Sequence, residues 1–234
     1  MDEGFTSYID DVALNVVLNE GKALPNAGAY RDYFRWVATG LEEPMTTHAD
    51  RFKYNTGYGM SAYDKGSIFL SQLQYVIGKE NFDNSLKKYF DDWAFKHPKP
   101  NDFIRSAEKV SGLELDWYLL DWAQSTMTID YAINSVVADK DMTTVNLQRI
   151  GQMGMPIDLK IKLSSGETLL YNIPMTKMRG SKPLKNMKVL DSWSWAKPYY
   201  SFTIDIIAEN ISEIIIDPKG EMADIDRMNN SLSL

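Results

Sequence analysis

The sequence contains no cysteine. Disulfide bonds, thiolate nucleophiles and thiolate metal sites are therefore excluded, and cysteine chemistry gives no indication of the compartment. Long apolar runs are also absent, since none approaches the length of about 20 residues that a membrane-spanning helix needs. Lysine and arginine form no long run, and the formal net charge is -7. This charge balance argues against sequence-independent binding of nucleic acid.

Histidine is scarce, and the two histidines are His48 and His97. Neither has a second histidine or a carboxylate at the spacing of a helical metal motif, and His97 precedes a proline, as in a loop. A surface or capping role is therefore favoured over metal ligation for both. No serine–histidine–aspartate arrangement and no Walker loop can be picked out. The sequence thus offers no familiar catalytic motif built on histidine or a phosphate-binding loop.

The first half of the chain has the pattern of a helical protein. Its 234 residues are 44% hydrophobic and 12% aromatic, which is typical of a well-packed globular protein. Apolar residues recur at helical spacing and predict helices at 5–17, 26–40, 61–78, 80–97, 100–112 and 115–125. Ser61 is expected to cap the third helix. The segment 41–60 has no apolar period and is expected to be a long loop of the kind that carries function.

The second half has the pattern of a β protein. From Thr128 onward, β-branched residues alternate with polar ones and are separated by turn-forming residues. Strands are expected at 128–137, 143–151, 157–163, 168–174, 200–207 and 212–218, with one more that cannot be placed. We therefore expect an α+β multidomain chain, with a helical region at 1–127 and an antiparallel β-sandwich of roughly seven strands at 128–234.

The first helix raises the question of what the acidic pair at its entrance does. Asp2 and Glu3 precede an apolar stripe that is expected to be buried and consists of Phe5, Tyr8, Ile9, Val12, Ala13, Val16 and Val17. Glu3 favours the positive end of the helix, which is an ordinary capping role. At about 100° per residue, however, it lies roughly 160° or more from Phe5 and Val12. Glu3 therefore faces something else, and a ligand or catalytic role stays open beside the capping role.

Two tyrosines stand at the end of the expected loop and the start of the third helix. Gly57 and Gly59 flank Tyr58 and allow the backbone to turn sharply, and Tyr63 follows five positions later. A tyrosine held there could donate a hydrogen bond to a developing oxyanion, whereas most tyrosines at helix starts only pack a ring. The aromatic residues Trp193, Trp195, Tyr199 and Tyr200 likewise could stack on a sugar or belong to the sandwich core.

Several segments resemble the zinc aminopeptidases related to aminopeptidase N and leukotriene hydrolase, the gluzincin group. "MDEGFTSY" is similar to the family's N-E-G-F or D-E-G-F motif, which places Glu3 in the position of the third zinc ligand. "YGMSAYDKG" is similar to its Y-x-K-G element, which places Tyr63, and Tyr58 five residues earlier, in the positions of its catalytic tyrosines. "FKHPKPNDFIRSAEKVSGLELDWYLLDW" and "IIIDPKGEMADIDRMNN" resemble later parts of the family, so the likeness covers nearly the whole chain.

The sequence also departs from the family, since it contains neither H-E-x-x-H nor G-x-M-E-N. In the family both lie upstream of the position that residue 1 occupies. The resemblance therefore implies the carboxy-terminal part of a longer enzyme, with the helical half of a thermolysin-like catalytic domain followed by a β-sandwich. The missing amino-terminal part of the same chain would be its partner and a peptide its substrate. A periplasmic or cell-envelope location is suggested by the family alone.

The resemblance implies a task for each residue of the intact enzyme. Zinc held by two histidines and one carboxylate keeps a position for water and lowers the pKa of that water to about 7. Tyr63 would stabilise the oxyanion and Tyr58 would support it. We expect no zinc and no peptidase activity from these 234 residues alone, because one carboxylate does not hold zinc. The alternative is a noncatalytic binding or scaffold protein in which the sandwich presents Trp193 and Trp195 to a partner.

Overall fold

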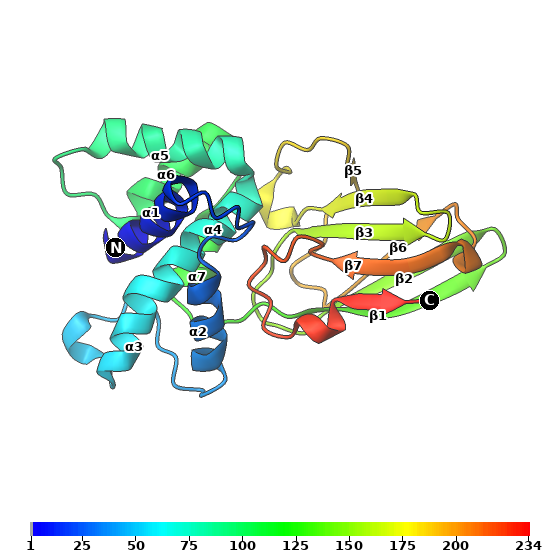
Figure 1. Cartoon of the computed structure of the whole chain (residues 1–234), viewed down its shortest axis with the longest axis horizontal. Coiled ribbons are helices and arrows are strands. Elements are labelled where there is room, and N and C mark those ends of the chain that lie inside the picture. Colours follow the sequence, from blue (N-terminus) through cyan, green and yellow to red (C-terminus); the bar gives the residue numbers. More distant parts are fainter. Residues whose placement is uncertain (1) are drawn as a thin grey trace. The chain divides into compact units, whose positions relative to one another are not determined.

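The computed structural model describes residues 2–234, and its contacts divide the chain into two units. The first is Met1–Thr126 and consists of helices, and the second is Met127–Leu234 and consists of strands (Figure 1). The sequence pattern predicts the change between residues 127 and 128. The chain therefore combines a helical unit with a β unit, as the α+β prediction states.

The helical unit is built around one buried helix, α4. Almost every side chain of α4 is buried, including small and polar ones, because neighbouring helices cover it on all sides. Gln72 of α4 donates to the hydroxyl of Tyr30 at 2.7 Å, so its buried amide is satisfied. The helices are α1 (Asp2–Val17), α2 (Ala27–Val37), α3 (Asn55–Gly59), α4 (Lys65–Ile77), α5 (Lys79–Trp93), α6 (Pro100–Ser111) and α7 (Asp116–Ala123).

The expected long loop at 41–60 is wrong in its second half. A 3-10 turn covers Ala49–Arg51, and helix begins at Asn55 and continues through the π-turn Met60–Asp64 into α4. Ser61 therefore lies inside a helical run and does not cap its start. The two glycines misled the prediction, because both adopt helical backbone angles here and neither forms a sharp turn.

The buried stripe predicted for the first helix is also wrong in part. In α1 the buried residues are Gly4 and Tyr8, whereas Ile9, Val16 and Val17 are exposed. The helix contacts α4 along the side that carries Gly4, and Phe5 packs against Phe103 with ring centroids 4.9 Å apart. The apolar period therefore identified the helix correctly but not the side that packs. None of the helices described over residues 2–234 is long and apolar enough to cross a lipid bilayer.

The β unit contains two sheets. One has the order β1-β2-β6, and the other has the order β5-β4-β3-β7-β8. All pairs are antiparallel except β4–β5, so the second sheet is mixed and the purely antiparallel prediction is wrong at this edge. The strands are β1 (Tyr131–Asp139), β2 (Met142–Arg149), β3 (Ile157–Leu163), β4 (Thr168–Ile173), β5 (Lys188–Val189), β6 (Tyr199–Ile204), β7 (Ile211–Ile216) and β8 (Ser231–Ser233).

Aromatic side chains connect the two sheets of the β unit. Tyr171 of β4 and Phe202 of β6 lie with ring centroids 5.7 Å apart, although their strands belong to different sheets. Trp193 is buried, stacks on Tyr200 at 5.2 Å and meets Tyr131 edge-on at 5.4 Å. These contacts form the core between the sheets and contribute the apolar burial that stabilises the unit.

Two buried carboxyl groups make the stability of the β unit depend on pH. Burial raises the pKa of Asp217 to about 6 and that of Asp224 to about 7, from an ordinary value of 3.8. The folded state therefore holds these protons more tightly than the unfolded state does. The unfolding free energy should fall as pH rises from about 4 to about 7, by up to about 7 kcal/mol for the two groups together, since each unit of pKa shift is about 1.4 kcal/mol. Urea unfolding at pH 4.5 and pH 8 measures this change.

The contribution of Asp224 is isolated by the variant Asp224→Asn, with the exposed Asp205→Asn as a control. The first should lose part of the pH dependence, whatever its absolute stability, and the second should keep all of it. Equal pH dependence in wild type and Asp224→Asn would show that Asp224 stays ionised in the folded protein over this range.

Candidate active site

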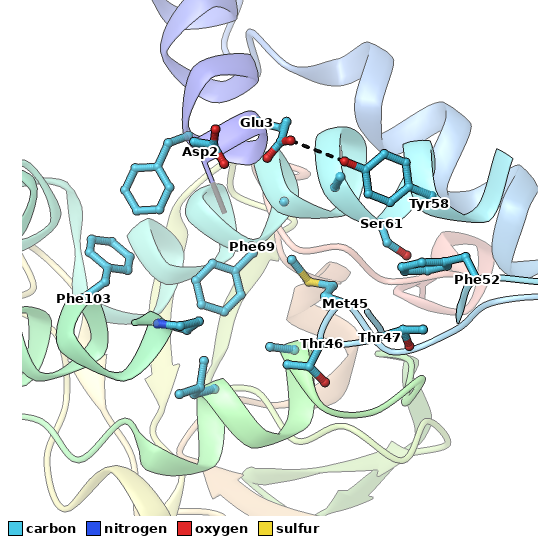
Figure 2. A pocket seen from close by; sticks show the side chains of 16 residues that line it. Asp2, Glu3, Met45, Thr46, Thr47, Phe52, Tyr58, Ser61, Phe69 and Phe103 are labelled. Atoms are coloured by element: carbon cyan, nitrogen blue, oxygen red, sulfur yellow. Dashed lines mark hydrogen bonds between the residues drawn. The ribbon is translucent and has the colours of Figure 1, made fainter. Parts of the chain in front are cut away.

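A cavity of about 360 Å³ lies within the helical unit (Figure 2). Its walls come from α1, α3, the π-turn Met60–Asp64, α4, α6, α7 and the segment around residues 45–52. Much of the lining is apolar and includes Phe5, Phe69, Phe103 and Leu119. Asp2 and Glu3 lie at one side of the cavity, where Figure 2 shows both carboxylates next to each other. A mostly apolar cavity with a few polar groups is the usual form of a ligand site.

Glu3 is held at the cavity by its position in the first turn of α1. Its side chain is half-buried, and its Oε1 accepts a hydrogen bond from the hydroxyl of Tyr58 at 3.4 Å (Figure 2). The carboxylate therefore faces the cavity, which Phe5 of the same helix also lines. The structure brings together two of the three residues proposed from the sequence, although they lie 55 positions apart in the chain.

Tyr58 interacts electrostatically with a second proposed residue, Tyr63. The negative charge of Glu3 raises the pKa of Tyr58, with smaller contributions from desolvation and from Tyr63. Tyr63 itself is 47% exposed and is not among the residues that line the cavity. Glu3 and Tyr58 thus meet at the cavity, whereas Tyr63 is connected to them only through its electrostatic effect on Tyr58.

A π-turn at Met60–Asp64 contains Tyr63 and follows the helix that carries Tyr58. Residues five positions apart in an α-helix point about 140° away from each other. In a π-turn the backbone bonds run from residue i to i+5, and here the N–H of Lys65 donates to the carbonyl of Met60. This widening makes the angle between the two tyrosines differ from that in a regular α-helix. The sequence carries no rule that predicts a π-turn, so this feature was missed.

A buried ion pair involves Lys65, two positions after Tyr63 in the sequence. Lys65 Nζ is 2.5 Å from Glu42 Oε1, and their side chains are 2% and 7% exposed. Lys65 also donates to the carbonyl of Ser125 at 3.3 Å. Burial lowers the pKa of Lys65 although Glu42 opposes this shift. The pair joins α4 to the segment that leads to the cavity residues Met45, Thr46 and Thr47. Sequence reasoning did not identify Glu42.

The histidines lie outside this site. His48 is exposed, and its Nδ1 accepts a hydrogen bond from the N–H of Asp50 at the start of a 3-10 turn. His97 is exposed between α5 and α6, and neither histidine lines the cavity. Over residues 2–234 no group of three histidine, aspartate or glutamate side chains is placed to hold a metal ion. The Glu3 carboxylate has the chemistry of one zinc ligand.

The two tryptophans considered for a binding surface differ in burial in the structure. Trp193 is 4% exposed, and its indole N–H donates to the carbonyl of Lys197 at 2.9 Å. It belongs to the core, so the scaffold alternative is wrong about this residue. Trp195 is exposed, and the ammonium of Lys177 lies 4.5 Å from the centre of its ring.

The comparisons with known proteins agree on one class. A model described as the peptidase family M1 domain matches residues 1–122. Aminopeptidase B of Mus musculus is 25% identical over 140 residues, which is 51% of this chain and 21% of that protein. Aminopeptidase M1-A of Oryza sativa subsp. japonica is 21% identical over 209 residues, which is 82% of this chain and 23% of that protein. Residues 1–122 therefore place this chain with the metallopeptidases.

The chain belongs to peptidase family M1. A structural comparison supports the fold over nearly the whole length: the crystal structure of Legionella pneumophila aminopeptidase A in complex with aspartic acid matches 95% of this chain. That match has a TM-score of 0.54, 17% identity and covers 23% of the Legionella chain. The chain thus spans about a fifth of the length of these relatives. The recognition of an aminopeptidase family from the two short motifs is confirmed.

Proposed function

We propose that these 234 residues are part of a zinc-dependent aminopeptidase that hydrolyses peptide bonds, and that they supply one zinc ligand and two tyrosines to its active site. The observation that carries the proposal is the contact between Glu3 and Tyr58 at the cavity. It joins the two motifs that resemble the family, and membership in peptidase family M1 supports the reaction class.

Each residue has a defined task in this proposal. Glu3 provides one carboxylate ligand, and Tyr58 orients that carboxylate by donating a hydrogen bond to Oε1. Tyr63 donates a hydrogen bond to the oxyanion that forms from the substrate carbonyl. The apolar walls formed by Phe5, Phe69 and Phe103 exclude water around the substrate. The remaining zinc ligands and the general base would come from residues outside this sequence, which has no H-E-x-x-H. A periplasmic or cell-envelope location is proposed from the family resemblance alone.

Zinc analysis tests this division of the site. After dialysis the 234-residue chain should retain far less than one zinc per chain and should release no aminoacyl group from a chromogenic amide, because one carboxylate does not compete with water for zinc. A longer chain from the same gene that includes H-E-x-x-H should retain one zinc. Glu3→Gln in the longer chain should lower the zinc content, whereas the exposed Glu20→Gln should not.

Two results would contradict the proposal. One is a stoichiometric zinc bound to the 234-residue chain, which would require a different ligand set. The other is a parent sequence without H-E-x-x-H, which would favour a noncatalytic protein.

A further inference from the structure

Helices α1 and α4 touch backbone to backbone at one pair of glycines. A Cβ added to Gly4 would lie 2.7 Å from the Cα of Gly66, and a Cβ added to Gly66 would lie 2.8 Å from the Cα of Gly4. Ordinary contacts of a Cβ are 3.4–4 Å. Both glycines are buried, and neither needs a left-handed backbone, so close packing of the helices is what requires glycine at these positions.

The two glycines flank the residues of the proposed site. Gly4 directly follows Glu3, and Gly66 follows Lys65, three positions after Tyr63. Because a helix is stiff over one or two turns, the distance between the two backbones at this contact sets the distance between the side chains beside it. The hydrogen bond from Tyr58 to Glu3 is already 3.4 Å long.

We propose that Gly4 and Gly66 are positioning residues that set the distance between the Glu3 carboxylate and the Tyr58 hydroxyl. That the glycine contact sets this distance is inferred from the contact itself. That the distance matters for catalysis rests on the proposed function. A methyl group at residue 66 requires a separation of at least 3.0 Å, and ordinarily 3.4–4 Å, where 2.8 Å is present. A shift of that size takes the Tyr58–Glu3 distance beyond about 3.6 Å, where a hydrogen bond is lost.

The chain offers a matched control and a competing anchor. Gly59 lies in the same helical run with φ of -57°, and a Cβ there would meet nothing within 4 Å. Gly59→Ala therefore adds the same methyl group without moving a helix. The competing anchor is Tyr8, whose hydroxyl donates to Oε1 of Gln74 at 2.9 Å and also ties α1 to α4. Tyr8→Phe removes that bond and leaves the glycine contact intact.

The test uses the 234-residue chain labelled with ¹³Cζ-tyrosine, with the Tyr58 signal assigned through Tyr58→Phe. The measured quantity is the change in the Tyr58 chemical shift caused by Glu3→Gln at pH 7, in each of four backgrounds. The change should be present in wild type, Gly59→Ala and Tyr8→Phe, and most of it should be lost in Gly66→Ala. Loss of global packing alone does not produce this pattern, because Tyr8→Phe also weakens the helix pair.

Each outcome decides the question. A full response in folded Gly66→Ala would overturn the proposal, as would the absence of a response in wild type. If Gly66→Ala does not fold, Tyr8→Phe decides: a retained response supports the glycine contact, and a lost response assigns the positioning to Tyr8 and Gln74. Failure of the proposed function is seen separately, as missing zinc in the longer chain.

Discussion

Glu42→Ala should lower the unfolding free energy of the helical unit by roughly 3–5 kcal/mol. The substitution removes the carboxylate that lies 2.5 Å from the ammonium of Lys65 and leaves that ammonium buried without its charged partner. The carbonyl of Ser125 and the ring of Trp122, 6.0 Å away, remain as its neighbours and do not replace a full charge. Lys65 would have to lose its proton or draw water into the core, and both cost free energy.

The double variant Glu42→Leu with Lys65→Met should recover most of this loss, because a buried ion pair replaced by apolar groups of similar volume is often neutral in stability. Urea unfolding followed by circular dichroism at 222 nm reports on the helices. Lys79→Ala is a matched control, since its pair with Asp83 is exposed and contributes about 0.3–0.5 kcal/mol. The unfolding free energy of Glu42→Ala is compared with that of wild type. A difference of less than about 1 kcal/mol would be no larger than the effect of a surface ion pair. Such a result would show that the Lys65 ammonium is not desolvated in the way the structure indicates.

The pair also has a consequence for the cavity. Glu42 stands three positions before Met45, and the N–H of Thr46 donates to the carbonyl of Ala123 at 3.1 Å. The segment that covers this side of the cavity is thus fixed at both the ion pair and the backbone bond. Loss of the Glu42–Lys65 pair should therefore destabilise the core and also make the segment around Met45 and Thr46, which lines the cavity, less well fixed.

Local patterns in the sequence identified the secondary structure well where one face of an element is buried. Strand β3 has the predicted bounds, 157–163, because its apolar residues alternate along the strand. Helix α6 begins at Pro100 as predicted, since proline at the first helical position has no N–H to satisfy. The short strands β5 and β8 carry too few residues for a period to be seen.

The site could be predicted only as far as its motifs. The sequence suggested Glu3, Tyr58 and Tyr63, but it did not show that Tyr58 and Tyr63 share one helical run, because a π-turn has no sequence signature of its own. Contacts between residues far apart in the chain also could not be predicted from the sequence. The Glu42–Lys65 pair and the Gly4–Gly66 contact depend on how helices pack, which local propensity does not determine.

Tyr63→Phe is expected to reduce turnover by roughly 10²–10³-fold in the longer, zinc-containing chain. The change removes one hydroxyl, so a hydrogen bond that forms only to the oxyanion is lost while the ring remains. The substrate KM should change little, because an interaction made only in the transition state appears in kcat. The side chain is 47% exposed, so stability and zinc content should remain those of wild type.

Tyr58→Phe separates the roles of the two tyrosines, because the hydroxyl of Tyr58 donates to Glu3, whereas Tyr63 has no such bond in the proposal. Loss of an outer hydrogen bond to a metal ligand typically weakens metal binding by about 10–100-fold. Tyr58→Phe should therefore lower zinc affinity, measured by competition with a chelator, and its lost turnover should return at high zinc concentration. Lost turnover in Tyr63→Phe should not return. Unchanged turnover in Tyr63→Phe would remove that residue from the reaction and leave Tyr58 as the tyrosine closest to the chemistry.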